Sequence, residues 1–140
     1  MRRVIVVCMN ELNQVIIPIS PAELMDKIAI LEVKSERIKD SDKLKNVRRE
    51  LELLRGIFKK SVKPTKELNR LFDKLRQLSA KGWDIEDKKR LCEKNGDFGP
   101  EFIKAARAAF KNNDERAAVW KEINLLLKSD IAQEKSYEEY

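Results

Sequence analysis

The sequence predicts a mainly α-helical fold of five or six helices, with one long antiparallel helical hairpin and a small β element at the N-terminus. Two apolar seams with helical spacing, joined by a short polar turn, predict the hairpin. The stretch SPAE at 20–23 is a helix start, and β-branched runs precede it. The chain has 140 residues, which suits a single domain over 1–140, because a domain of this size buries roughly 68–70% of the surface that its unfolded chain exposes.

Two short β-branched runs form the predicted β element. They are VIVVC at 4–8 and VIIPI at 15–19, with polar residues between them, which is typical of a small hairpin. Pro18 has no backbone N–H to donate, so the second strand is expected at a sheet edge. Met9 offers an internal start, so residues 1–8 are interpreted as an upstream extension; the domain itself is expected to begin after residues 1–13.

The first helix begins with strong capping signals. Ser20 is the predicted N-cap, Pro21 occupies the first helical position and Glu23 completes a capping box. An apolar seam follows at intervals of four and three, interrupted once by a serine: Leu24, Ile28, Leu31, Ser35 and Ile38. Further apolar side chains widen this face: Met25, Ile30 and Val33. The helix is therefore predicted to contact more than one neighbour.

The second helix follows a polar turn, KDSDK at 39–43, which also supplies its N-cap. Its seam continues the same spacing: Leu44, Val47, Leu51, Leu54 and Phe58. So short a connection makes 21–39 and 42–60 antiparallel neighbours, and this hairpin is expected to be the longest feature of the fold. Gly56 costs about 1 kcal/mol relative to alanine inside a helix, so it indicates fraying or a close helix approach.

Shorter helices are predicted for the rest of the chain. Regularly spaced leucines define a third helix, which Gly82 ends: Leu68, Leu71, Leu75 and Leu78. Asp84 is the expected cap of a short fourth helix over 85–94, and Pro100 opens a fifth. The stretch Asn112-Asn113-Asp114 is expected to break the chain before a sixth helix through Trp120, Ile123 and Leu127. Residues 132–140 have little to bury and are expected to be mobile unless a partner holds them.

Composition argues against several function classes. The chain has no histidine, which removes the usual general base near neutral pH and the commonest zinc ligand. Cys8 and Cys92 lack metal-ligand spacing and are better explained by a reducing compartment than by a disulfide framework. No apolar run approaches the ~20 residues of a membrane span and no signal-peptide pattern is present, so a cytoplasmic protein is expected. No catalytic residue, metal ligand or cofactor is assigned.

The positive charge of the chain is concentrated in one region. The formal net charge is +6, and residues 34–63 carry 11 basic and 5 acidic side chains. The basic-arm candidates for contact with nucleic acid or another anion are Lys45, Arg48, Arg49, Arg55, Lys59 and Lys60. The interleaved Glu50 and Glu52, and the absence of an aromatic stacking platform, favour a solvated helix face instead.

A second candidate region lies at the start of the first helix. Glu23 and Asp26 each have a capping or helix-dipole explanation, while Asp26 and Lys27 also lie beside an unusually wide apolar face. If Asp26 points inward it needs a buried partner, for which Arg116 is the candidate. The binding or junction candidates are Asp26, Lys27, Asn113, Asp114 and Arg116.

Two pairs of carboxylates raise the alternative of an enzyme. Glu23/Asp26 and Asp84/Asp87 are spaced i, i+3, which places both carboxylates of a pair on one helix face. All-α nucleotide pyrophosphohydrolases hold magnesium with pairs of this kind. Here the pairs are far apart in sequence and Glu23 and Asp84 both have capping explanations, so this is the least favoured interpretation.

Several stretches resemble a known family. ELMDKIAIL at 23–31 resembles the motif ELLDKITIL, which marks a family of short, functionally uncharacterised bacterial proteins, and the likeness continues through KLKNVRREL, NDERAAVWKEIN and EKSY. Met25 and Ala29 stand where the family usually has Leu and Thr, and Trp120 stands where Lys is common, which argues against a role that needs a cation there. The resemblance implies a fold and marks positions without implying an activity.

The favoured functional prediction is a non-enzymatic helical module that binds another protein or a second copy of itself. An edge strand containing VII and an apolar face wider than one seam both need covering, so a homodimer is expected through the N-terminal segment or the long hairpin. The alternative is binding of nucleic acid or an anionic ligand through the basic arm.

Overall fold

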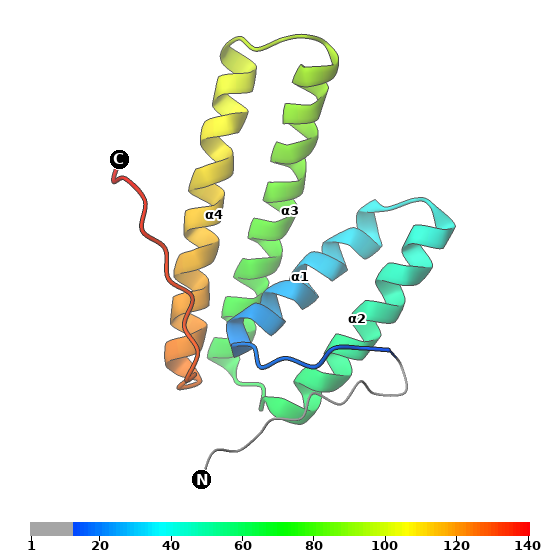
Figure 1. The fold of residues 1–140 in the computed structure, drawn as a ribbon, viewed down its shortest axis with the longest axis vertical. Coiled ribbons are helices and arrows are strands. Elements are labelled where there is room, and N and C mark those ends of the chain that lie inside the picture. Colours follow the sequence, from blue (N-terminus) through cyan, green and yellow to red (C-terminus); the bar gives the residue numbers. More distant parts are fainter. Residues whose placement is uncertain (1–12) are drawn as a thin grey trace.

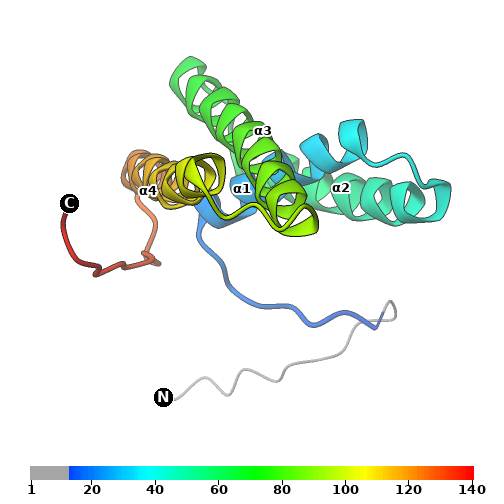
Figure 2. The same cartoon turned by 90° about the horizontal axis from the view of Figure 1, so that it is seen from above.

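The computed structural model describes residues 13–140, which form four α-helices: α1 (Pro21–Arg37), α2 (Ser41–Ser61), α3 (Lys66–Lys94) and α4 (Pro100–Leu126) (Figure 1). They make two antiparallel hairpins, α1/α2 and α3/α4. The backbone of α1 approaches all three other helices, whereas that of α2 approaches α1 alone, although Phe58 of α2 packs against the cluster shared by α1, α3 and α4. Seen from above, α3 crosses over α1, with α4 on one side and α2 on the other (Figure 2). None of the helices within 13–140 has the length and apolar character needed to cross a membrane.

The caps that open the first three helices explain where each begins. Ser20 Oγ accepts from the Glu23 N–H at 3.2 Å, Asp40 Oδ1 accepts from the Lys43 N–H at 2.9 Å, and Thr65 Oγ1 accepts from the Leu68 N–H at 3.1 Å. Each bond satisfies one of the N–H groups that a helix start leaves without an internal partner. The predicted starts of α1 and α2 are therefore confirmed.

The predicted helix count and the predicted longest element are wrong. The third and fourth predicted helices form the single α3 of 29 residues, the fifth and sixth form α4 of 27 residues, and both are longer than α1 or α2. Gly82 does not end a helix: a Cβ there would lie 3.1 Å from Asn112 Nδ2, so glycine makes room for α4. Asn112 does not break α4, because its buried amide donates to the Leu78 carbonyl of α3 at 3.0 Å.

The predicted N-terminal β element is not seen in the described part of the chain. Residues 15–19 form no strand there, and the partner run 4–8 lies outside the described residues. Val15, Ile16 and Ile17 are instead 71%, 66% and 64% exposed.

The core consists of two clusters on either side of α1. One cluster faces α2 and is built on Leu24, Ile28, Leu31 and Leu51, as the two seams predict. The other joins α1 to the long hairpin: Ala22, Met25, Ala29, Leu68, Leu71, Leu75, Leu78, Val119 and Ile123. The small, fully buried Ala22 and Ala29 let the backbones approach. The expectation that α1 contacts more than one neighbour is confirmed.

Candidate functional site

A buried ion pair joins the first turns of α1 to the middle of α4. Asp26 is only 3% exposed, and Arg116 holds it with two hydrogen bonds: Nη2 donates to Oδ2 at 2.5 Å and Nε donates to Oδ1 at 3.2 Å. Arg116 Nη1 also donates to Asn113 Oδ1 at 3.3 Å. An unpaired carboxylate at this depth would cost far more than a capping contact gains, so the pair is a condition of α1 docking here.

Two amide side chains, Asn124 of α4 and Gln133 beyond it, form hydrogen bonds with residues at the start of α1. The Ala22 N–H donates to Asn124 Oδ1 at 3.1 Å, and Asn124 Nδ2 donates to Gln133 Oε1 at 3.3 Å. Gln133 Oε1 also accepts from Ser20 Oγ at 3.1 Å, and its Nε2 donates to Glu23 Oε2 at 3.3 Å. Gln133 therefore ties the C-terminal segment to the N-terminus of α1, 110 residues away in sequence at Glu23.

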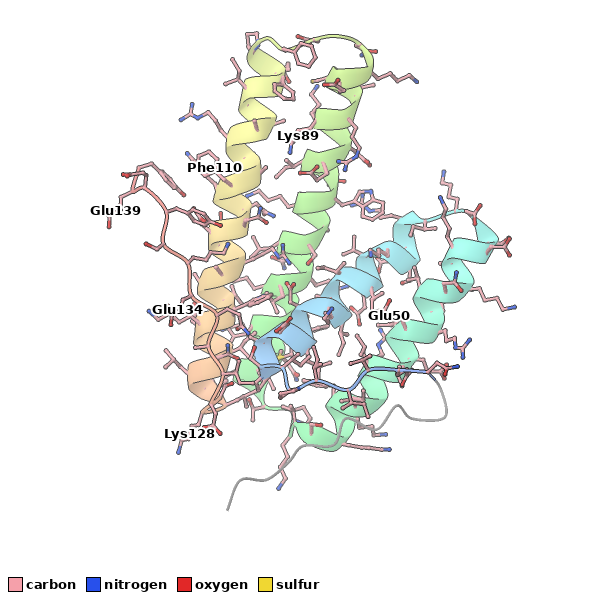
Figure 3. The ribbon with its side chains drawn as sticks, viewed as in Figure 1. Glu50, Lys89, Phe110, Lys128, Glu134 and Glu139 are labelled. Atoms are coloured by element: carbon pink, nitrogen blue, oxygen red, sulfur yellow. The ribbon has the colours of Figure 1, made fainter. Side chains whose placement is uncertain are left out.

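The C-terminal segment, residues 129–140, turns back along α4 (Figure 1). Figure 3 labels Lys128, Glu134 and Glu139 along this path, with Phe110 of α4 beside its far end. Tyr140 packs edge-on against Phe110 with ring centroids 5.1 Å apart, and its hydroxyl donates to Asp114 Oδ2 at 2.9 Å. This bond to a carboxylate raises the pKa of the Tyr140 phenol above its ordinary value. Mobility of 132–140 remains a prediction, but partners for this segment exist within the same chain.

A groove of about 480 Å³ lies between α4 and the C-terminal segment. A second hollow of about 440 Å³ lies between α3 and α4 near Trp83. Asn113 and Arg116 line both, so the ion pair stands between two concave surfaces. This arrangement makes the Asp26–Arg116 junction and its groove the best candidate for a functional site on the described surface.

The structure brings together three of the five junction candidates. Arg116 contacts both Asp26 and Asn113, and the expected partnership of Asp26 with Arg116 is present. Asp114 lies on the same helix but bonds Tyr140 instead. Lys27 is exposed, outside the junction.

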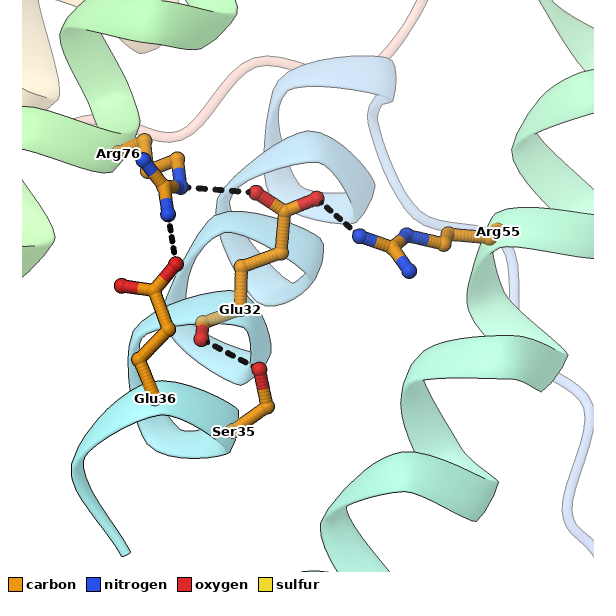
Figure 4. Close-up of polar contacts among 5 residues, drawn as sticks. All are labelled: Glu32, Ser35, Glu36, Arg55 and Arg76. Atoms are coloured by element: carbon orange, nitrogen blue, oxygen red, sulfur yellow. Dashed lines mark hydrogen bonds and ion pairs between the residues drawn. The ribbon is translucent and has the colours of Figure 1, made fainter.

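The six basic-arm candidates all lie on the exposed surface of α2. Arg55 forms an ion pair that links α2 to α1: its Nη2 lies 2.5 Å from Glu32 Oε1 (Figure 4). Arg76 of α3 binds the other oxygen of Glu32 at 3.0 Å and also pairs with Glu36, so this network links α1 to α2 and α3. No ion pair with a described residue involves the other five: Lys45, Arg48, Arg49, Lys59 and Lys60.

The two acidic pairs do not form one site. Asp26 is held by Arg116, Glu23 by Gln133, and Asp84 by Arg37, whose Nη1 lies 2.6 Å from Asp84 Oδ1. This exposed contact raises the pKa of Arg37, chiefly through the hydrogen bond to Asp84. Over 13–140, no group of three or more Cys, Asp or Glu side chains is arranged to hold a metal ion. The carboxylate spacing therefore has a structural explanation at each of these three positions.

Sequence reasoning missed Asn124, Gln133 and the Glu32 network. For Asn124 a signal existed: Asn113, Arg116, Trp120 and Asn124 are spaced by three and four residues, so they follow one face of α4. Gln133 has no such signal, because it lies in a polar segment without periodicity.

Among the known proteins and families compared with this chain, one family model matches it. Neither the search of curated proteins nor the search of solved structures gave a match. A family model described as a family of unknown function, DUF6165, matches residues 15–140, which include both hairpins and the C-terminal segment. The chain therefore belongs to the family of unknown function DUF6165.

Proposed function

We propose that the protein is a non-enzymatic, cytoplasmic helical module that associates with a second copy of itself through the segment before α1. The supporting observation is the exposure of three consecutive β-branched side chains, Val15, Ile16 and Ile17, of which even the least exposed is at 64%. Full burial of one such side chain stabilises by about 1.5–3 kcal/mol, so covering this segment is a substantial driving force.

A two-fold contact suits this segment. Identical short β-branched segments from two chains can pair as antiparallel strands about a two-fold axis. Each copy then covers the apolar segment of the other. Pro18 lacks a backbone donor, so it ends the pairing before α1 begins. Leu53 and Ile57, also exposed on α2, form another apolar surface available to a partner.

Light scattering over a concentration series tests self-association. The expected mass at high concentration is twice the 16.4 kDa of one chain. The double variant Ile16→Ser/Ile17→Ser is expected to raise the dissociation constant at least tenfold, because each lost burial of about 1.5 kcal/mol or more corresponds to a factor of about ten. Leu91→Ser, at an exposed leucine of α3, is the matched control and should leave the mass unchanged. A monomer mass for the unmodified protein at high concentration would contradict the proposal.

A second candidate function is RNA binding by the basic arm, supported by the five exposed cations of α2 that no described carboxylate pairs. If about five phosphates are contacted, log K should fall with log salt at a slope near −4. Arg48→Glu/Arg49→Glu should lose most of the affinity, while the charge-matched control Lys104→Glu/Arg107→Glu on exposed positions of α4 should keep it. A salt-independent interaction, or equal losses in the two double variants, would leave the basic arm as a solvated face.

A further inference from the structure

The groove between α4 and residues 129–135 has the dimensions and walls of a small-molecule site. Its volume of about 480 Å³ falls within the range of roughly 300–1,000 Å³ that ligand pockets occupy. One wall is α4 and the other is the C-terminal segment, which Gln133 fastens through its bonds to Ser20, Glu23 and Asn124. Gln133 thus anchors the second wall to the start of α1 and to α4.

The groove is lined by several apolar side chains and by charged side chains that are mostly cations. Ala117, Trp120, Leu125 and Ala132 supply the apolar surface. Leu125 is 70% exposed, which leaves apolar area for a ligand to cover. Three cations, Arg116, Lys121 and Lys135, face one carboxylate, Glu134.

Arg116 retains hydrogen-bond donors for an anionic group. A guanidinium has five N–H donors, and three atoms of Arg116 already donate: Nε and Nη2 to Asp26 and Nη1 to Asn113. The remaining N–H groups of Nη1 and Nη2 have no partner among the described residues. Because the side chain is already fixed by Asp26, a ligand does not have to immobilise it. Asp26 balances the charge of Arg116, so the net attraction for an anion comes from Lys121 and Lys135.

Trp120 supplies the aromatic surface of the same wall. Its indole Nε1 is buried and has no hydrogen-bond partner within the described structure. Because that nitrogen has almost no exposed surface, a ligand in the groove would contact the ring of Trp120 rather than its N–H.

We propose that this groove binds a small amphipathic organic anion, with its carboxylate or phosphate group toward Arg116, Lys121 and Lys135 and its apolar or aromatic body on Trp120 and Leu125. This site is separate from the proposed self-association through 15–17. Either one can therefore fail without the other.

The two tryptophans of the chain make the test specific. In a nitrogen–proton correlation spectrum they give two indole cross-peaks, which Trp83→Phe assigns. Titration with phenyl phosphate is expected to shift the Trp120 cross-peak saturably and to leave that of Trp83 in place. Benzylamine, a cation with a similar apolar body, should not do so. Inorganic phosphate, which lacks the apolar body, should bind at least tenfold more weakly.

Two charge-reversal variants separate the site from general surface attraction. Lys121→Glu/Lys135→Glu is expected to weaken phenyl phosphate binding at least tenfold without unfolding the protein, because both lysines are exposed. Lys104→Glu/Arg107→Glu, with the same change of net charge, should stay within twofold of the unmodified protein. The proposal is overturned by the absence of a saturable shift, by an equal response to benzylamine, by equally tight binding of inorganic phosphate, or by equal losses in the two variants.

Discussion

Replacing Arg116 with methionine is expected to lower the free energy of unfolding by about 3–5 kcal/mol, because it leaves the buried carboxylate of Asp26 without its partner. The remaining hydrogen bonds near the junction cannot compensate, since Asn113 is exposed and itself serves as an acceptor for Arg116. Urea denaturation followed by circular dichroism measures the change. The effect is large compared with the roughly 5–15 kcal/mol that stabilises an ordinary domain.

Two comparisons isolate the cause of that loss. Asp26→Leu combined with Arg116→Met removes both charges and should be more stable than Arg116→Met alone, because no ion is left unpaired in the interior. Arg70→Met breaks an exposed pair with Glu67 and should lower the free energy of unfolding far less than Arg116→Met does, because solvent screens an exposed pair. A loss for Arg116→Met no greater than for Arg70→Met would show that water reaches Asp26 and that the junction is not dry.

Leu75→Ala is expected to cost about 2–5 kcal/mol, the usual range for truncating a buried leucine. Leu75 is 0% exposed and belongs to the cluster where α1, α3 and α4 meet. The cavity left by its side chain is walled by three helices that the Asp26–Arg116 pair and the Glu32 network hold in place, so collapse around it is limited. Thermal and urea unfolding both report this change.

Leu125→Ala is the matched control for Leu75→Ala. It removes the same atoms from a leucine that is 70% exposed, so its effect should stay within about 0.5 kcal/mol. If Leu75→Ala cost less than about 1 kcal/mol, the three-helix cluster would be loosely packed, and the argument that α1 is fixed against the long hairpin would fail.

The first two helices could be predicted from sequence because local signals and tertiary packing agree there. Ser20 and Asp40 cap the helices that their positions indicate, and the two seams meet in the cluster that contains Ile28 of α1 and Leu51 of α2. The predicted breaks at Gly82 and at Asn112 failed because the two signals disagree. A glycine costs about 1 kcal/mol in a helix, which is less than the packing and the Asn112–Leu78 bond gain by bringing α3 and α4 together.

Of the candidate site, the ion pair could be predicted from the sequence but the groove could not. A carboxylate on an apolar helix face requires a cation, and the search for one leads to Arg116. The groove depends on where residues 129–135 lie, and that depends on single bonds from Gln133 to side chains 113 and 110 residues away. Polar contacts between segments so distant in sequence leave no periodic pattern, so the groove could only be found in three dimensions.

The position of α1 between two partners has a consequence for the order of events on the ribosome. Its first partner, α2, follows directly, but the arginine that neutralises Asp26 is 90 residues further along the chain. At about 5–20 residues per second, synthesis of that interval takes roughly 5–20 s. During this time the α1/α2 hairpin carries an uncovered apolar face that contains the unpaired charge of Asp26. Because α3 and α4 contact each other extensively, we expect the α3/α4 hairpin to close before α1 docks onto it.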